Sequence, residues 1–164
     1  MKLRENEGPN CCVSLLPWDT DWRGFAEHVL RTGPPYQSTI EIKVAAYSWG
    51  AGYGFIKLAQ QLNKRGIGIK TAVLSDPVYR NVWALWRSLW SPILGEPKIY
   101  IPSNVDEVYY FRQREFRPYG CQCVAEDMDC TKIVDCGLLQ APHIWMDEAE
   151  PFHRKAIEKL GEAK

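Results

Sequence analysis

The sequence predicts an α/β domain whose mainly parallel sheet has about five or six strands, with helices on both faces. The first observation is that short apolar runs typical of buried strands alternate with apolar residues at helical spacing. The second is the run from Ile40 to Tyr47, which begins in alternation and passes into Ala45-Ala46, as in a strand buried on both faces. With 164 residues and 46% hydrophobic content, one domain is expected over residues 1–164, with residues 1–10 as an N-terminal tail.

Apolar runs bounded by turn residues indicate where the strands lie. They are expected near residues 11–16, 40–47, 69–75, 97–101 and 107–112. From Arg112 to Ala141 the pattern is weaker. Only Lys132 to Val134 suggests a strand there, so this region is expected to be mostly loop.

Apolar side chains three or four positions apart indicate the helices. These are expected at residues 22–30, 55–62 and 152–160. Asp19 or Thr20 is the expected cap of the first helix, because a side-chain oxygen can accept a hydrogen bond from a backbone N–H of the first turn. Gly33-Pro34-Pro35 ends that helix, and Arg65-Gly66 is a stop signal after the second.

Ser48 lies between the strand near residues 40–47 and the following helix, framed by small residues. Ala46 lies two positions before it and Gly50 two positions after it, so the segment has the form A-x-S-x-G. A nucleophile elbow turns so sharply that its serine is strained and neighbouring backbone passes close on both sides, which only small residues permit. The preceding strand and following helix therefore favour Ser48 as a nucleophile.

An acid and a histidine follow Ser48 in the order that a catalytic triad requires. The strand near residues 69–75 ends in Ser75-Asp76-Pro77, which places Asp76 at a strand's carboxyl end, one helix after the serine. His143 lies in a loop just before the last helix. Serine, acid, histidine is the chain order of the α/β hydrolases and differs from the chymotrypsin and subtilisin orders.

On these residues the chain resembles the α/β-hydrolase superfamily, in particular its small lipase, esterase and cutinase-like members, over roughly residues 11 to 160. The resemblance implies a compact hydrolase fold and a serine hydrolase that cleaves a carboxylic ester through an acyl-enzyme. It also implies an oxyanion hole made by the backbone N–H of Trp49 and that of Trp18 or Asp19. The loop at Trp18 departs from the usual His-Gly or Pro-Gly. No metal or organic cofactor is implied.

Several alternatives stay open at the level of single residues. Many relatives place the acid one strand later, which makes Asp106 an alternative to Asp76, although Asp106 lies where the chain enters its strand. His28 and His153 fall on helical patterns and are poorer bases than a loop histidine. Serine at a strand end, Asp-Pro and a lone histidine are also common in turns without any catalytic role.

A tryptophan stripe and the choice of substrate leave further alternatives. Trp83, Trp86 and Trp90 share one face of an expected helix, which could bind substrate as a lid or acyl-chain wall, or could belong to the core. The expected partner is a small-molecule ester or lipid-like substrate, and a thioester or amide could react by the same route. A non-catalytic binding protein on a hydrolase scaffold is the alternative of a different class.

Composition and cysteine content limit the compartment and the cofactors. Twenty basic and twenty acidic residues cancel, so no charged surface points to nucleic acid, and no apolar run is long enough to cross a bilayer. The charged start from Met1 to Glu7 without an apolar signal core favours the cytoplasm. Nothing in the sequence indicates an oligomeric state.

Free thiols are the simplest interpretation of one cysteine cluster, with zinc or disulfides as alternatives. Its members are Cys121, Cys123, Cys130 and Cys136.

Overall fold

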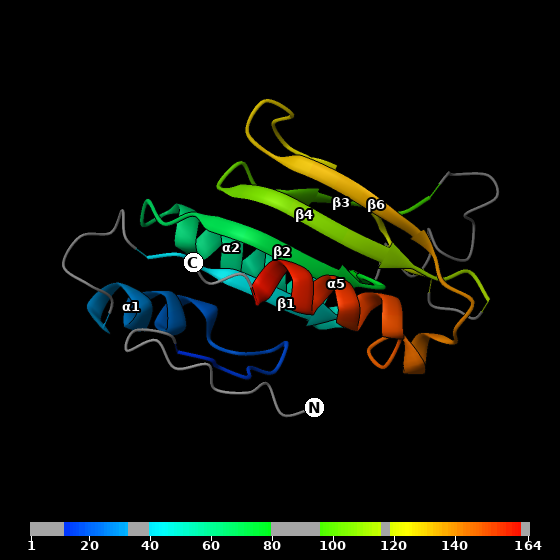
Figure 1. Cartoon of the computed structure of the whole chain (residues 1–164). Helices are drawn as coiled ribbons and strands as arrows, with labels where there is room; N and C mark the ends of the chain where they lie inside the picture. Colours follow the sequence, from blue (N-terminus) through cyan, green and yellow to red (C-terminus); the bar gives the residue numbers. More distant parts are fainter. Residues whose placement is uncertain (1–11, 33–39, 80–95, 116–118, 162–164) are drawn as a thin grey trace.

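A four-stranded parallel sheet forms the centre of the computed structural model, which describes residues 12–32, 40–79, 96–115 and 119–161. Its strands, in spatial order, are β1 (Lys43–Tyr47), β2 (Ile69–Ser75), β4 (Val105–Arg112) and β6 (Lys132–Leu138) (Figure 1). Each neighbouring pair runs parallel, so the carboxyl ends of all four strands meet at one edge. The prediction of an α/β domain with a mainly parallel sheet is confirmed, with four strands in this sheet.

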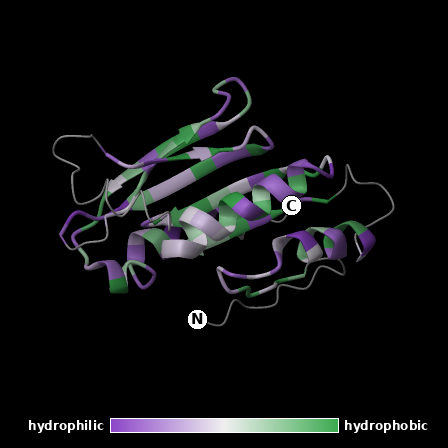
Figure 2. Ribbon diagram, turned by 180° about the vertical axis from the view of Figure 1, so that it is seen from behind, coloured by the Kyte–Doolittle hydropathy of each residue, from purple (hydrophilic) through white to green (hydrophobic). Residues whose placement is uncertain are grey.

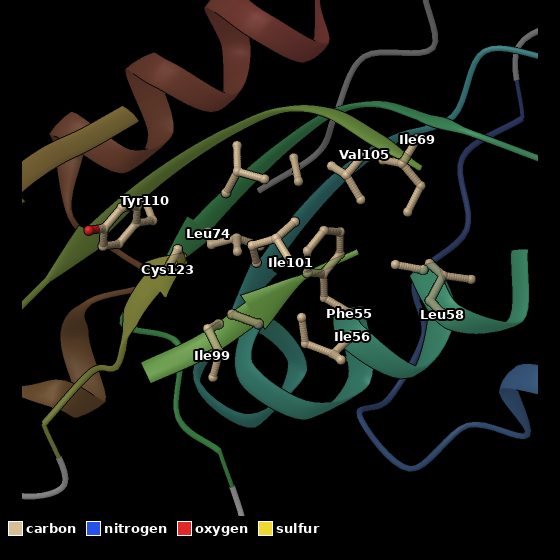
Figure 3. Close-up of a cluster of buried hydrophobic side chains, with 14 of the residues drawn as sticks. Phe55, Ile56, Leu58, Ile69, Leu74, Ile99, Ile101, Val105, Tyr110 and Cys123 are labelled. Carbon is tan, nitrogen blue, oxygen red and sulfur yellow. The ribbon is translucent and has the colours of Figure 1, made fainter. Parts of the chain in front are cut away.

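Two shorter strands form a separate sheet. β3 (Lys98–Ile101) pairs in parallel with β5 (Gln122–Ala125). The strand expected near residues 97–101 therefore exists but lies outside the main sheet. Ile99, Ile101 and Cys123 point from this pair into the same core as Phe55 (Figure 3), so the small sheet covers one face of the large one.

Helices cover both faces of the main sheet. On one face lie the π-helical turn η2 (Gly50–Gly54) and α2 (Phe55–Asn63), and α1 (Trp22–Thr32) packs against α2. On the other lies α5 (Glu150–Leu160), preceded by the 3-10 turn η3 (His143–Trp145).

Side chains along β2 alternate between two cores, one for each layer of helices. Leu74 packs in the core that contains Phe55 of α2, whereas Val73 packs in the core that contains Phe152 of α5. Figure 2 shows that hydrophilic and hydrophobic residues both occur along α1, as expected for an amphipathic helix. No helix among the described residues is long and apolar enough to cross a membrane.

The end of α2 and the start of α1 can be compared with the sequence signals, whereas the predicted stop at Gly33-Pro34-Pro35 lies outside the described residues. α2 ends before Gly66, which has the positive φ of 68° that glycine adopts without steric cost. Asp21 caps α1 in place of the predicted Asp19 or Thr20, because its carboxylate accepts a 3.1 Å hydrogen bond from the Gly24 N–H. The Thr20 hydroxyl instead donates to the Pro17 carbonyl at 2.7 Å and closes the turn before the helix.

The strand predicted near residues 11–16 is wrong for the residues described. Residues 12–17 contain no strand, and the side chains of Val13 and Leu15 are 70% and 100% exposed. Strand propensity is realised only where a neighbouring strand and a core accept the side chains, and this segment has neither. Among the described strands, β1 therefore pairs with β2 and lies at an edge of the sheet.

The strand suggested at Lys132 to Val134 is confirmed as part of β6, and most of the described residues from Arg112 to Ala141 lie outside strands, but β5 was not predicted. β6 extends past the three residues that suggested a strand, through Asp135 and Gly137. The Asp135 carboxylate accepts hydrogen bonds from the Tyr110 hydroxyl at 3.0 Å and from the Arg112 guanidinium at 2.5 Å. Gly137, at φ 99°, lies where the pairing with β4 shifts register. By residue type alone, Asp135 and Gly137 would be expected in a turn. The long-range contacts of β6 keep them in a strand instead.

Candidate active site

Ser48 lies at the carboxyl end of β1, where the chain turns directly into η2 and α2. Its φ is 54°, in the left-handed region that residues with a side chain seldom adopt. The N–H of Val78 donates a 3.0 Å hydrogen bond to the Ser48 carbonyl, which ties this turn to the segment after β2. Ser48 therefore has the strained strand-to-helix geometry that the sequence predicted for it.

Asp76 occupies the equivalent place after β2, and its φ is 44°. Within the described residues, Ser48 and Asp76 are the two positions other than glycine that have positive φ. The Asp76 N–H donates to the Phe111 carbonyl of β4 at 2.8 Å, and its carboxyl group is fully buried. Backbone strain of this kind costs on the order of 1–3 kcal/mol per residue and concentrates at functional sites.

His143 connects the two strained residues. Its Nε2 lies 2.8 Å from the Ser48 Oγ, and its Nδ1 lies 2.5 Å from the Asp76 Oδ2. Because a carboxylate accepts hydrogen bonds, the tautomer with hydrogen on Nδ1 suits this arrangement and leaves Nε2 as the acceptor for the serine hydroxyl. The structure thus brings together the three residues selected from the sequence as nucleophile, base and acid.

Gln113, which the sequence analysis missed, supports the Asp76 carboxylate. Its backbone N–H lies 3.2 Å from Asp76 Oδ1, and its side-chain Nε2 lies 3.1 Å from Oδ2. The side-chain Oε1 accepts a 2.9 Å hydrogen bond from the N–H of Glu115, which fixes the orientation of the amide. With His143, three donors therefore surround a carboxylate that has no contact with solvent. The only signal for Gln113 is its place just after β4.

The alternative acid and bases lie elsewhere. Asp106 is at the amino end of β4, half exposed, and pairs with Lys70 at 2.9 Å. In a parallel sheet that end is opposite to the edge where Ser48 lies. His28 is an exposed residue of α1, and His153 lies on α5, as the helical patterns predicted.

The loop predicted to supply an oxyanion donor lies beside the residue that follows the serine. The rings of Trp18 and Trp49 meet edge to face with centroids 5.3 Å apart, and the Trp22 Nε1–H donates to the Trp18 carbonyl at 3.2 Å. The donor roles of Trp49 and of Trp18 or Asp19 stay predictions. Trp83, Trp86 and Trp90 lie outside the described residues.

A cavity of about 300 Å³ lies next to this loop, between α1 and α2. Aromatic and charged side chains line it together, and none of the three triad residues is among them. Its lining comprises Trp18, Asp19, Thr20, Asp21, Trp22, Arg23, Tyr53, Lys57 and Gln61.

The turn after Ser48 requires a glycine at position 52, and not at position 50 as the sequence pattern suggested. A Cβ added at Gly50 would meet nothing within 4 Å, so close approach does not require glycine there. At Gly52, by contrast, an added Cβ would lie 2.1 Å from the Val78 carbonyl oxygen. Gly120 is also closely packed, because an added Cβ would lie 2.1 Å from Asp76 Oδ1 and 3.2 Å from the Asp76 Cα. The close contacts thus join η2 and the loop before β5 to the segment that follows β2.

The four clustered cysteines differ in exposure. Cys121 and Cys123 are buried, Cys130 is exposed, and Cys136 is intermediate; none of the described cysteines forms a disulfide. Burial raises the pKa of the Cys121 thiol to about 11 and also raises that of Cys123, which disfavours their thiolates. In the part of the chain that the structure describes, no group of three or more histidine, cysteine or acidic side chains could hold a metal ion.

Comparison of the chain with protein-family models, with curated proteins and with solved structures finds no match.

Replacement of Gly52 by alanine should destabilise the fold, whereas Gly50→Ala should not. The Cβ of an alanine at position 52 would collide with the Val78 backbone, which cannot rotate away as a side chain can. The free energy of unfolding should therefore fall by roughly 1–3 kcal/mol or more. Gly50 is helical and an added Cβ would meet no atom, so Gly50→Ala should raise the free energy of unfolding by up to about 1 kcal/mol. Urea unfolding of the two variants measures this difference, and equal stability would contradict the close approach at Gly52.

Gln113→Leu should lower the free energy of unfolding by about 1–3 kcal/mol, because it removes one donor from a buried carboxylate and leaves the Glu115 N–H without its acceptor. Asp106→Asn is the matched control, since it breaks an exposed ion pair that contributes about 0.2–1 kcal/mol. Urea unfolding again provides the measurement. A Gln113→Leu variant as stable as the control would show that Asp76 does not depend on the amide.

Proposed function

We propose that the protein is a serine hydrolase that cleaves carboxylic esters through an acyl-enzyme. The observation that carries this proposal is the continuous relay from Ser48 Oγ through the His143 ring to the Asp76 carboxylate, with separations of 2.8 Å and 2.5 Å. A serine that only closes a turn needs neither a histidine at hydrogen-bond distance nor a buried acid behind that histidine. Nucleophile, base and orienting acid are the parts that acyl transfer requires.

In the proposed reaction the Ser48 Oγ attacks the ester carbonyl carbon while its proton moves to His143 Nε2. Asp76 holds the ring in place and stabilises the imidazolium. When the tetrahedral intermediate collapses, the bond to the alkoxy group breaks and His143 returns the proton to the leaving alcohol. A water molecule then attacks the acyl-serine ester by the same route, which releases the carboxylic acid and restores Ser48.

The negative charge of the tetrahedral intermediate needs hydrogen-bond donors. We assign this role to the backbone N–H of Trp49, which follows the nucleophile, and to that of Trp18 or Asp19. The edge-to-face contact between the Trp18 and Trp49 rings supports the pairing of these two segments. A thioester or an amide could use the same residues. The proposed setting is the cytoplasm, with a small-molecule ester or lipid-like compound as substrate.

The second candidate is a non-catalytic binding protein on the same type of scaffold. The observation that favours it is the cavity of about 300 Å³ lined by Trp18, Trp22 and Tyr53, since the triad residues do not line it. The three aromatic rings of this cavity offer surfaces on which a ligand could stack, and the other lining side chains are charged or polar. A binding protein, however, has no need of a serine made reactive by a histidine.

A fluorophosphonate probe distinguishes the two candidates, because it reacts covalently with activated serines. Stable labelling that maps to Ser48 is the expected result, together with hydrolysis of short p-nitrophenyl esters. Ser48→Ala should lose both while its melting temperature stays near that of the wild type, because one small side chain replaces another. Well-folded protein that takes up no label would favour the binding protein.

Asp76→Asn should lower kcat for the short esters by roughly 10⁴-fold, because the amide favours the wrong histidine tautomer. Asp106→Asn is the control, since that carboxylate pairs with Lys70 at the other end of its strand. Initial rates at saturating ester provide the measurement. A large loss in Asp106→Asn with normal rates in Asp76→Asn would reverse the assignment of the acid.

A further inference from the structure

Tyr47 and Ser75 are neighbours across the two strands that deliver the nucleophile and the acid. Each is the last residue of its strand, and the register pairs them directly. Tyr47 immediately precedes Ser48, and Ser75 immediately precedes Asp76. Because successive strand residues face opposite sides of a sheet, the pair faces the layer that contains α5, from which His143 approaches.

Both side chains donate hydrogen bonds to backbone carbonyls of the turn that carries His143. The Tyr47 hydroxyl donates to the carbonyl of His143 itself. The Ser75 Oγ, which is fully buried, donates to the Met146 carbonyl at 2.7 Å. The Met146 N–H donates to the His143 carbonyl at 3.2 Å and closes the turn. The two hydroxyls therefore hold both ends of one 3-10 turn against the sheet.

Side-chain packing fixes the end of this turn at Met146 more firmly than its middle. Ile144 and Trp145, the two residues after His143, are 69% and 59% exposed, so their side chains contribute little packing. Met146 is the residue of the turn whose side chain is fully buried. The Tyr47 ring also lies beside the His143 ring, with centroids 5.3 Å apart and planes inclined by 31°.

We propose that Tyr47 and Ser75 are positioning residues of the site, which hold the His143 ring where it can bond to both Ser48 and Asp76. This inference rests on the proposed hydrolase function only for its kinetic consequence. A base must lie within hydrogen-bond reach of its proton donor, and a displacement of about 1 Å can cost on the order of 100-fold in rate. The two residues act through the turn and do not touch the substrate.

The protonation state of Tyr47 agrees with a constant anchoring role. Burial raises the pKa of its phenol to about 12, with further contributions from the negative charges of Asp147 and Asp76. The phenol therefore keeps its proton throughout the neutral range and remains a donor to the His143 carbonyl. Any pH dependence of the rate near neutrality has to come from other groups.

The test compares Tyr47→Phe, Ser75→Ala and the double variant with Tyr109→Phe. Tyr109 faces the same core, but its hydroxyl donates to Glu107 at 3.0 Å, so its loss leaves the His143 turn untouched. Each single anchor variant should lower kcat for short esters about tenfold and the double variant about 100-fold, with KM within twofold of the wild type. Tyr109→Phe should retain normal kcat. Ser75→Thr, which keeps a hydroxyl, should recover most of the rate lost in Ser75→Ala.

A second measurement does not depend on catalysis. The exchange with water of the His143 Nδ1 proton, followed by NMR, should be at least tenfold faster in the double variant, because the ring no longer stays against Asp76. If the wild type neither hydrolyses esters nor takes up the fluorophosphonate, the hydrolase proposal fails while this exchange still tests the anchors. Unchanged exchange and unchanged kcat in folded Tyr47→Phe would overturn the positioning role, even if Ser75→Ala does not fold.

Discussion

The parallel, in-register pairing of β1 with β2 is the constraint on which the site depends. It ends the two strands at the same edge, with Tyr47 opposite Ser75, so that the next residue of each chain segment leaves the sheet at an equivalent place. Those residues are Ser48 and Asp76, and both turn through a positive φ. Antiparallel pairing would put the end of one strand beside the start of the other, which would separate the serine from the acid by the length of the strands.

The hydrogen-bond chain of the site then follows the order of the strands. It begins at Ser48 after β1, passes through His143 to Asp76 after β2, and ends at Gln113 after β4. Burial of the Asp76 carboxylate would cost several kcal/mol without partners, and its donors offset that cost. One of them, the Gln113 backbone N–H, is available because β4 ends next to β2. The sheet therefore both places the acid and compensates for its burial.

The sequence predicted those parts of the fold and the site that depend on local pattern. Ser48, Asp76 and His143 each follow or precede an element with a clear apolar period, so their places could be inferred from one segment at a time. Gln113 gives no such signal, because its role depends on the return of β4 beside β2. Gly52 was missed for the same reason, since its constraint is the Val78 carbonyl, which belongs to a different segment.

Errors in the strands had the same physical origin. Residues 12–17 have strand-like composition but form no strand with any described segment, whereas β6 contains Asp135 and Gly137 and nevertheless pairs with β4 on both sides of the register shift. Pairing between distant segments decides such cases, and a hydrogen bond from Tyr110 to Asp135 cannot be inferred from local residue types. The described helices were predicted more accurately, because their hydrogen bonds are local. At α1 the cap is Asp21, one residue after Thr20 and two after Asp19.

Ser48 and His143 belong to segments that pack on opposite faces of the sheet. The distance between them is therefore sensitive to how the two layers of helices align. Ser48 leads into α2, whose side chains fill the core on one face of the sheet, whereas the His143 turn leads into α5, which packs on the other face. Asp76 lies at the sheet edge between them. The hydroxyls of Tyr47 and Ser75 link the His143 turn directly to the strand ends, so its position relative to Ser48 does not depend only on the packing of α5. A site assembled from two cores needs such direct links, because small shifts in packing that a core tolerates would exceed the tolerance of a hydrogen-bonded relay.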